Sequence, residues 1–340
     1  MAAYRQLMRG YAAVARRGRR PDPAPAAQPL ALTVARKTTE ATGVVGLRLE
    51  SASGTALPAW DPGAHLDLVL PSGRIRQYSL CGDPADRGGY QIAIRRVPDG
   101  VGSAEIHDDL AEGDAVAARP PRNAFPFAHP ALARANIDNL VFVAGGIGIT
   151  PILPMIRVAA ETGADWHLTY FGRGHDTMPF LDRLARYDTG RVRVLTSAAD
   201  GRPDTATLLS RARAGSAVYF CGPPGLIAGV RASFATTGAA GLHYERFAAP
   251  PVTGGQPFDV HLARTGATLH VPADRSALAV ARENLPGVAY SCQQGFCGTC
   301  RVTVLGGQVE RRGQAAFLAA PDTMLLCSDR VQGEDITLDL

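Results

Sequence analysis

The chain has 340 residues, of which 46% are hydrophobic and 19% are charged, and its formal net charge is +4. This composition excludes a chain that is disordered throughout, and the length allows two or three packed domains. Outside the first twenty residues the basic side chains form no stripe, which argues against a nucleic-acid partner. No apolar run is long enough to span a bilayer.

Residues 1–30 are predicted to form a basic extension. Arginines lie among small residues in the first twenty positions, so no apolar core of a secretory signal is present. Apolar residues recur there at helical spacing, which leaves a short amphipathic helix and a partly ordered extension as alternatives. We therefore expect a soluble, cytoplasmic protein with no membrane partner.

Residues 31–136 are predicted to form an antiparallel β-barrel. Short segments rich in β-branched and aliphatic residues, such as HLDLVLP and YQIAIRRV, are separated by Gly and Pro. One strand ends in Arg76, Gln77, Tyr78 and Ser79. A flavin site needs these residue types, because an arginine neutralises a phosphate, an aromatic lies beside the ring, and a hydroxyl bonds near the reactive nitrogen.

A second phosphate-binding element is predicted directly after the strand YQIAIRRV, which contains Ile94 and Arg95. Gly102 and Ser103 begin a short helix there. The N-terminus of a helix offers free N–H groups to an anion. Arg95 is explained equally well as part of a charged barrel surface.

Residues 137–247 alternate buried-type strands with helical segments, which predicts a doubly wound α/β sheet. The first strand runs into a glycine turn and a helix, formed by Gly145, Gly146, Gly148, Thr150 and Pro151. Such a turn lets the backbone approach a pyrophosphate, although glycine turns after strands are common. A later strand ends in Cys221, Gly222 and Pro223. The carboxyl ends of strands are where such sheets bind ligands, but Cys221 alone would also suit a buried core.

Arg173 and Asp176 follow the strand LTYFG, where the adenosine ribose of a dinucleotide would lie. An arginine suits the 2'-phosphate of NADPH, whereas a nearby acidic residue suits NADH. Both residues are also explained as solvated surface, and the residues alone leave the choice open.

Four of the six cysteines lie near the C-terminus, at Cys292, Cys297, Cys300 and Cys327. The first three have the C-x4-C-x2-C spacing of a plant-type 2Fe-2S cluster, and the fourth follows at a distance. A zinc site is the alternative, but zinc motifs usually pair two C-x2-C knuckles. Disulfides suit short secreted chains rather than this pattern.

Three resemblances follow from these motifs. After a linker at residues 248–257, residues 258–340 resemble a plant-type ferredoxin domain, which implies an α+β, β-grasp fold. The glycine turn together with Cys221-Gly222-Pro223 resembles the nicotinamide module of the ferredoxin reductase superfamily, in which the cysteine lies beside the reacting ring. The order of the modules over residues 31–340 resembles the phthalate dioxygenase reductase and vanillate demethylase reductase family.

The ferredoxin resemblance includes two departures. The family commonly has an acidic residue after the first ligand, where this chain has Gln293. It also has an Arg-Asp pair late in the domain, where this chain has Arg312 and Gly313. Neither position is a cluster ligand, so both departures concern potential or docking.

The family resemblance implies an NADH-dependent reductase component of a multi-component oxygenase. It implies FMN rather than FAD, NADH rather than NADPH, a 2Fe-2S cluster, and a Rieske non-haem iron oxygenase or a cytochrome P450 as partner. Ser79 and Cys221 would tune hydride transfer, and Phe247 would cover the flavin. A stand-alone diaphorase or ferric reductase, and an electron carrier with a degenerate flavin site, are the alternatives.

Overall fold

The computed structural model divides into two compact units, Pro29–Ala248 and a second that runs from Ala249 to Leu340. Residues 1–28 of the predicted N-terminal extension and the predicted ligands Cys292 and Cys297 lie outside the described residues, whereas Leu30, at the end of that extension, already begins the first strand. No helix among the described residues is long and apolar enough to cross a membrane. The structure describes residues 29–98, 100–127, 137–187, 190–247, 252–285, 288–290, 293, 295, 298–312, 320 and 322–340.

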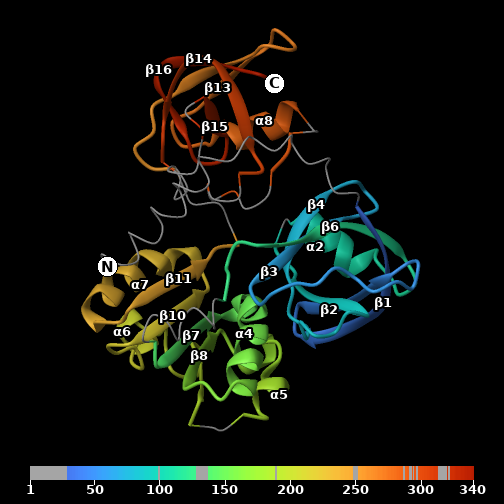
Figure 1. Cartoon of the computed structure of the whole chain (residues 1–340), viewed down its shortest axis with the longest axis vertical. Helices are drawn as coiled ribbons and strands as arrows, with labels where there is room; N and C mark the ends of the chain where they lie inside the picture. Colours follow the sequence, from blue (N-terminus) through green and yellow to red (C-terminus); the bar gives the residue numbers. More distant parts are fainter. Residues whose placement is uncertain are drawn as a thin grey trace, which may run out of the picture. The chain divides into compact units, whose positions relative to one another are not determined.

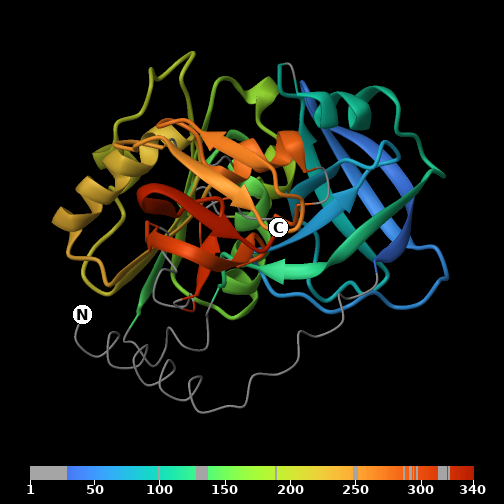
Figure 2. The same cartoon turned by 90° about the horizontal axis from the view of Figure 1, so that it is seen from above.

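The first part of the larger unit is a six-stranded antiparallel sheet with the order β4-β3-β6-β1-β2-β5 (Figure 1). Its strands are β1 (Leu30–Ala41), β2 (Val44–Ser51), β3 (Ala64–Val69), β4 (Ile75–Ser79), β5 (Gly89–Arg95) and β6 (Ala115–Asn123). The chain leaving β4 meets β5, where the N–H of Cys81 donates to the carbonyl of Gln91 at 2.8 Å. The sheet therefore closes into the predicted barrel. Helix α2 (Val101–Asp108) lies beside the barrel strands (Figure 2). Its Ile106 packs into the same core as Leu66.

The second part of the larger unit is a five-stranded parallel sheet with the order β11-β10-β7-β8-β9. Its strands are β7 (Asn139–Gly145), β8 (Trp166–Gly172), β9 (Val192–Thr196), β10 (Ser216–Cys221) and β11 (Gly241–Glu245). Between them lie the 3-10 turns η1 (Gly146–Gly148) and η2 (His175–Thr177) and helices α4 (Ile149–Glu161), α5 (Leu181–Leu184), α6 (Thr205–Leu208) and α7 (Pro224–Thr237).

Alternation along β7 explains why helices cover both faces of this sheet. Phe142 packs in the core that contains residues of α4 and α5, whereas Val141 and Val143 pack with residues of α6 and α7. Successive side chains of a strand point to opposite faces, so a strand that is apolar throughout needs cover on both. The predicted doubly wound fold is confirmed.

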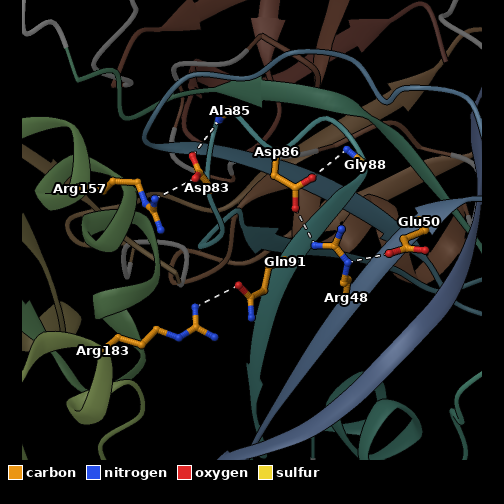
Figure 3. A network of polar contacts seen from close by, with 9 residues as sticks. All are labelled: Arg48, Glu50, Asp83, Ala85, Asp86, Gly88, Gln91, Arg157 and Arg183. Atoms are coloured by element: carbon orange, nitrogen blue, oxygen red, sulfur yellow. Dashed lines mark hydrogen bonds and ion pairs between the residues drawn. The ribbon is translucent and has the colours of Figure 1, made fainter. Parts of the chain in front are cut away.

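The barrel and the parallel sheet share one core and are also joined by polar contacts. Phe125 from the end of the barrel packs against Tyr219 of β10, with ring centroids 5.8 Å apart. Arg157 of α4 pairs with Asp83 at 2.8 Å, and Arg183 donates to Gln91 at 3.0 Å (Figure 3). These contacts fix the orientation of the two parts within the unit.

The smaller unit contains a mixed sheet with the order β13-β12-β16-β14-β15, in which only the β12–β16 pair is parallel. Its strands are β12 (Phe258–Leu262), β13 (Thr268–Val271), β14 (Arg301–Glu310), β15 (Thr323–Leu325) and β16 (Arg330–Leu338). Helix α8 (Ala277–Asn284) begins after Ser276, whose hydroxyl accepts from the N–H of Ala279 at 3.2 Å. Leu278 packs into the core of the sheet. The predicted α+β module is confirmed.

We predict that Gly63→Ala destabilises the larger unit strongly. Gly63 has φ +90°, and a Cβ atom there would lie 1.8 Å from the carbonyl oxygen of Phe125. Gly73→Ala is the matched control, because Gly73 has φ +78° but nothing within 4 Å of a Cβ. We expect Gly63→Ala to lower the free energy of unfolding by about 2 kcal/mol more than the control does.

Urea unfolding followed by tryptophan fluorescence measures this loss, because both tryptophans, Trp60 and Trp166, lie in the larger unit and are buried. Equal losses in the two glycine variants would show that the collision with Phe125 does not occur.

Candidate active site

A positively charged cradle lies where β4 meets the start of α2. Arg76 is half-buried there and donates one N–H to the carbonyl of Ile75 at 2.9 Å. Gly102 packs so closely that a Cβ atom on it would lie 2.7 Å from Arg76 Nε. Helix α2 begins after Gly100 without a side-chain cap. A guanidinium beside uncapped helical N–H groups fits a phosphate, so these residues suit the end of a flavin.

The neighbours of the cradle shape it. The hydroxyl of Ser103 donates to the carbonyl of Gly100 at 2.8 Å and accepts from the N–H of Val97 at 3.1 Å, which holds the loop before α2. Ile94 is buried in the barrel core. Arg95 is exposed, and its Nη1 would lie 3.5 Å from a Cβ atom at Gly146. Arg95 therefore lies between the barrel and the glycine turn.

The middle of the predicted flavin motif is bound within the barrel wall. The Gln77 amide donates to the Asp67 carboxylate at 3.0 Å, and Asp67 is fully buried beside Arg122 at 2.5 Å. Burial raises the pKa of Tyr78 far above its ordinary value, so its hydroxyl stays protonated. Cofactor contacts of Gln77 and Tyr78 stay predictions.

A buried corner is formed by Ser79, Cys221 and Glu245. Ser79 ends β4, whereas Cys221 and Glu245 are paired in register at the carboxyl ends of β10 and β11. The Ser79 hydroxyl donates to Glu245 Oε2 at 3.5 Å, and all three residues are buried. The barrel and the parallel sheet therefore meet at this corner.

Burial makes the corner electrically neutral. It raises the pKa of Glu245 to about 8, and the hydrogen bond from Ser79 offsets only part of that increase. Burial, and secondarily Glu245, raise the pKa of the Cys221 thiol well above its usual range. Near neutral pH, Glu245 can therefore hold a proton on a carboxyl oxygen, and Cys221 is a thiol rather than a thiolate.

The glycine turn lies against the end of β10. A Cβ atom at Gly148 would lie 2.3 Å from the carbonyl oxygen of Cys221, and one at Gly145 would lie 2.6 Å from Pro223. Gly222 lies between them, 3.1 Å from the position of the Gly148 Cβ. The chain proceeds from β7 to β8 and β9 on one side and then crosses to β10 and β11 on the other. Ligands bind at such a switch point in open α/β sheets.

The remaining predicted residues of the nicotinamide site lie around this crossing. Thr150 and Pro151 are buried in the first turn of α4, where the Thr150 hydroxyl donates to the carbonyl of Ile147 at 2.9 Å. Arg173 is exposed at the end of β8. Phe247, just after β11, is 51% exposed. The structure thus brings the glycine turn and the Cys221 segment together, with Arg173 one strand away.

The smaller unit brings two predicted cluster ligands into one core. Cys300 and Cys327 are buried, and the N–H of Leu326 donates to the carbonyl of Cys300 at 3.2 Å. Gly298 has φ +73°, a conformation that glycine adopts without strain. The buried Ser328 hydroxyl has no hydrogen-bond partner among the described residues. Two buried thiols beside an unsatisfied donor fit a sulfur-rich cluster.

The sequence matches two family models: an oxidoreductase FAD-binding domain over residues 30–127 and a 2Fe-2S iron-sulfur cluster binding domain over residues 260–332. The chain is 33% identical to phthalate dioxygenase reductase from Burkholderia cepacia over 92% of this chain and 97% of that protein. The chain is also similar to a solved structure of phthalate dioxygenase reductase, whose title describes a modular structure for electron transfer from pyridine nucleotides to [2Fe-2S]. The two sequences are 32% identical, and the TM-score is 0.68. The match covers 92% of this chain and 98% of that one.

A third similarity is to a much longer protein. The crystal structure of an intact type IV self-sufficient cytochrome P450 monooxygenase is 34% identical, with TM-score 0.72. The match covers 94% of this chain and 43% of that one, so this chain spans less than half of the longer protein.

The fold and the matched domains define an oxidoreductase that combines a flavin-binding barrel, a nicotinamide-type sheet and a 2Fe-2S module. The chain belongs to the phthalate dioxygenase reductase family, as its motifs predict.

Glu245 is the site residue that the sequence analysis missed. It lies in the stretch HYERF, in which only Phe247 was singled out. Its partner Ser79 is 166 positions away, so no local spacing links them. The one available signal was an acidic residue at the carboxyl end of a strand, the edge where these sheets bind ligands.

We predict that Glu245→Gln flattens the pH dependence of stability in the apoprotein. The folded-state pKa of about 8 lies above the ordinary 4.5, so the folded chain keeps a proton that the unfolded chain releases. The free energy of unfolding therefore falls as pH rises through this window. Removing the titration should reduce that fall by up to a few kcal/mol.

Urea unfolding at about pH 5 and about pH 8 measures the difference. Glu161→Gln, an exposed position in the same unit, is the control and should follow the wild type. A Glu245→Gln protein whose stability falls with pH as steeply as the wild type would contradict the buried carboxyl.

Proposed function

We propose that the chain is the NADH-dependent reductase component of a multi-component oxygenase, with FMN and a 2Fe-2S cluster as its cofactors. The observation that carries this proposal is the buried corner of Ser79, Cys221 and Glu245. It joins a phosphate cradle on one side to a dinucleotide-type crossing on the other, within one compact unit. The same chain then continues into the 2Fe-2S module.

The cofactors would supply redox chemistry that no side chain offers, since a flavin takes up two electrons as a hydride and releases them singly to an iron–sulfur centre. The protein's own contribution is orientation. Arg76 and the start of α2 would hold a phosphate, and the close packing of Gly148 on Cys221 would fix the glycine turn beside the corner that contains Ser79. Burial of the corner excludes water, and Glu245 holds a proton rather than a charge there.

The surface beside the phosphate cradle supports FMN rather than FAD. The outer side of α2 borders a cavity of about 630 Å³ lined by residues that include Glu105, Asp108, Asp109 and Asp114, with Arg74 as the basic side chain. An adenylate would bring a second phosphate to this surface. The charged side chains of the lining are four acids and one arginine, which repel that phosphate, whereas FMN ends at the cradle.

The end of β8 supports NADH rather than NADPH. Arg173 and Asp176 are both exposed just after β8, the strand that pairs with β7 next to the glycine turn, and Asp176 lies in η2. A carboxylate at this position suits the free ribose hydroxyls of NADH and repels a 2'-phosphate. Arg173 would then contact the dinucleotide backbone.

The names of the relatives support a Rieske non-haem iron oxygenase or a cytochrome P450 as the partner. One relative is a dioxygenase reductase, and another matched protein is a self-sufficient P450 monooxygenase. A diaphorase without a dedicated partner would share the same site, and coupled substrate oxidation by an oxygenase distinguishes it. Cys81 and Cys221 are buried thiols that form no disulfide bond, which suits a reducing compartment, and we place the protein in the cytoplasm.

We expect the purified, iron- and sulfide-loaded protein to show flavin and cluster absorption bands that bleach together when NADH is added. NADPH should act at a much higher concentration, and heat should release FMN, identified by chromatography. A protein with cluster bands but no flavin would be an electron carrier, and the proposed enzyme function would be abandoned.

We predict that Cys297→Ser stops reduction of one-electron acceptors while NADH still reduces the flavin, because the variant removes a cluster ligand and leaves the larger unit intact. Stopped-flow absorbance separates the two steps. Cys81→Ser is the control, because Cys81 is buried in the larger unit and is no ligand. If NADH no longer reduced the flavin of the Cys297→Ser protein, the proposal that flavin reduction needs only the larger unit would be contradicted.

A further inference from the structure

Arginines of the iron–sulfur module hold the segment that leads into it. Arg312, just after β14, donates one N–H to the carbonyl of Thr253 and another to the carbonyl of Gly254, each at 3.0 Å. Arg330, the first residue of β16, donates to the carbonyl of Gln256. We call Thr253–Gln256 the strap, since three of its four carbonyls are bound by the module that follows it.

Close backbone packing holds the strap at its centre. A Cβ atom at Gly255 would lie 2.0 Å from the carbonyl oxygen of Ala273 and 3.0 Å from Arg330 Cζ. No other residue type fits at this distance without moving the strap. The close approach to Ala273 is a backbone packing contact, whereas the arginines donate hydrogen bonds, so two different kinds of interaction hold the same segment.

The guanidinium of Arg330 binds backbone carbonyls. Its side chain lies over the ring of Phe258 at 4.8 Å and donates to the carbonyls of Pro272 and Arg275, besides that of Gln256. It is 2% exposed, and no carboxylate among the described residues forms an ion pair with it. A buried cation needs compensation, and here backbone carbonyls, including one from the strap, supply it.

We propose that binding of the strap shortens the connection between Phe247 and the iron–sulfur module, and that Arg312 and Arg330 are positioning residues for electron transfer from flavin to cluster. With the strap bound, the connection comprises the five residues 248–252. With the strap released, it comprises the ten residues 248–257. Effective concentration falls as about the −3/2 power of linker length, so release lowers it roughly threefold. The proposal rests on the proposed function.

Two variants release the strap from opposite sides. Arg312→Ala removes the two hydrogen bonds that the module donates to the carbonyls of the strap. Gly255→Ala places a Cβ atom of the strap against the carbonyl oxygen of Ala273 and so displaces the strap. Arg264→Ala is the matched control, because Arg264 lies in the same module and pairs with Asp339 at 2.8 Å rather than with the strap. Arg330 is left intact, since its burial ties it to the fold.

The full-length, cofactor-loaded proteins are mixed with NADH in a stopped-flow instrument, and flavin and cluster reduction are followed separately. We expect flavin reduction to be unchanged in all variants and cluster reduction to be two- to threefold slower in Arg312→Ala and Gly255→Ala. Their combination should be no slower than the slower single variant, because both release one strap. Arg264→Ala should match the wild type.

Amide hydrogen exchange gives a second readout that does not depend on turnover. We expect exchange at Val252–Gln256 to be faster in both strap variants and unchanged in Arg264→Ala. Faster exchange with wild-type cluster reduction, unchanged exchange, an equal slowing of both reduction steps, or loss of the cluster absorption would each overturn the proposal. Failure of the proposed function looks different, because wild-type flavin would then not respond to NADH.

Discussion

The close approach of the glycine turn to the end of β10 is the constraint on which the site depends. Gly148 packs on the Cys221 carbonyl at a distance that no side chain could occupy. This contact brings the two ends of the crossing together, and the register of β10 with β11 then sets Glu245 beside Cys221. Ser79 reaches the same place from the barrel because both parts of the unit share one core. A larger residue at the turn would therefore disturb the buried corner of Ser79, Cys221 and Glu245.

In the larger unit, the positive charge at Arg76 and the proposed site of hydride transfer lie at different places. The end proposed to bind phosphate has positive charge from Arg76 and the start of α2, whereas the corner proposed for hydride transfer is buried and holds neutral Glu245 and Cys221. Anions bind well where guanidinium and helical N–H groups converge. Hydride transfer needs orientation and exclusion of water instead. The same barrel meets both requirements because β4 carries Arg76 on one side and ends in Ser79 at the corner.

Much of the fold follows from local signals, and the parts that do not follow depend on distant partners. Glycine turns and cysteine spacing are local, so the modules and their order could be predicted. Strand β6 contains two prolines and three polar residues in RPPRN, which look like a loop, yet Arg122 pairs there with the buried Asp67 of β3. Glu245 looks like an ordinary surface acid until tertiary packing buries it beside Ser79. In both cases the decisive partner lies far away in the sequence.

Arginine recurs wherever this chain joins one part to another. Arg157 and Arg183 connect the helices of the parallel sheet to the barrel, and Arg312 and Arg330 bind the strap to the iron–sulfur module. A guanidinium has several donors in a fixed plane, so it can bind two carbonyls at once, which a lysine ammonium does less precisely. Arg312 keeps the arginine of the Arg-Asp pair in the ferredoxin pattern, and the departure from that pattern is at Gly313. The guanidinium of Arg312 donates hydrogen bonds to two carbonyls of the strap and to the carboxylate of Glu310.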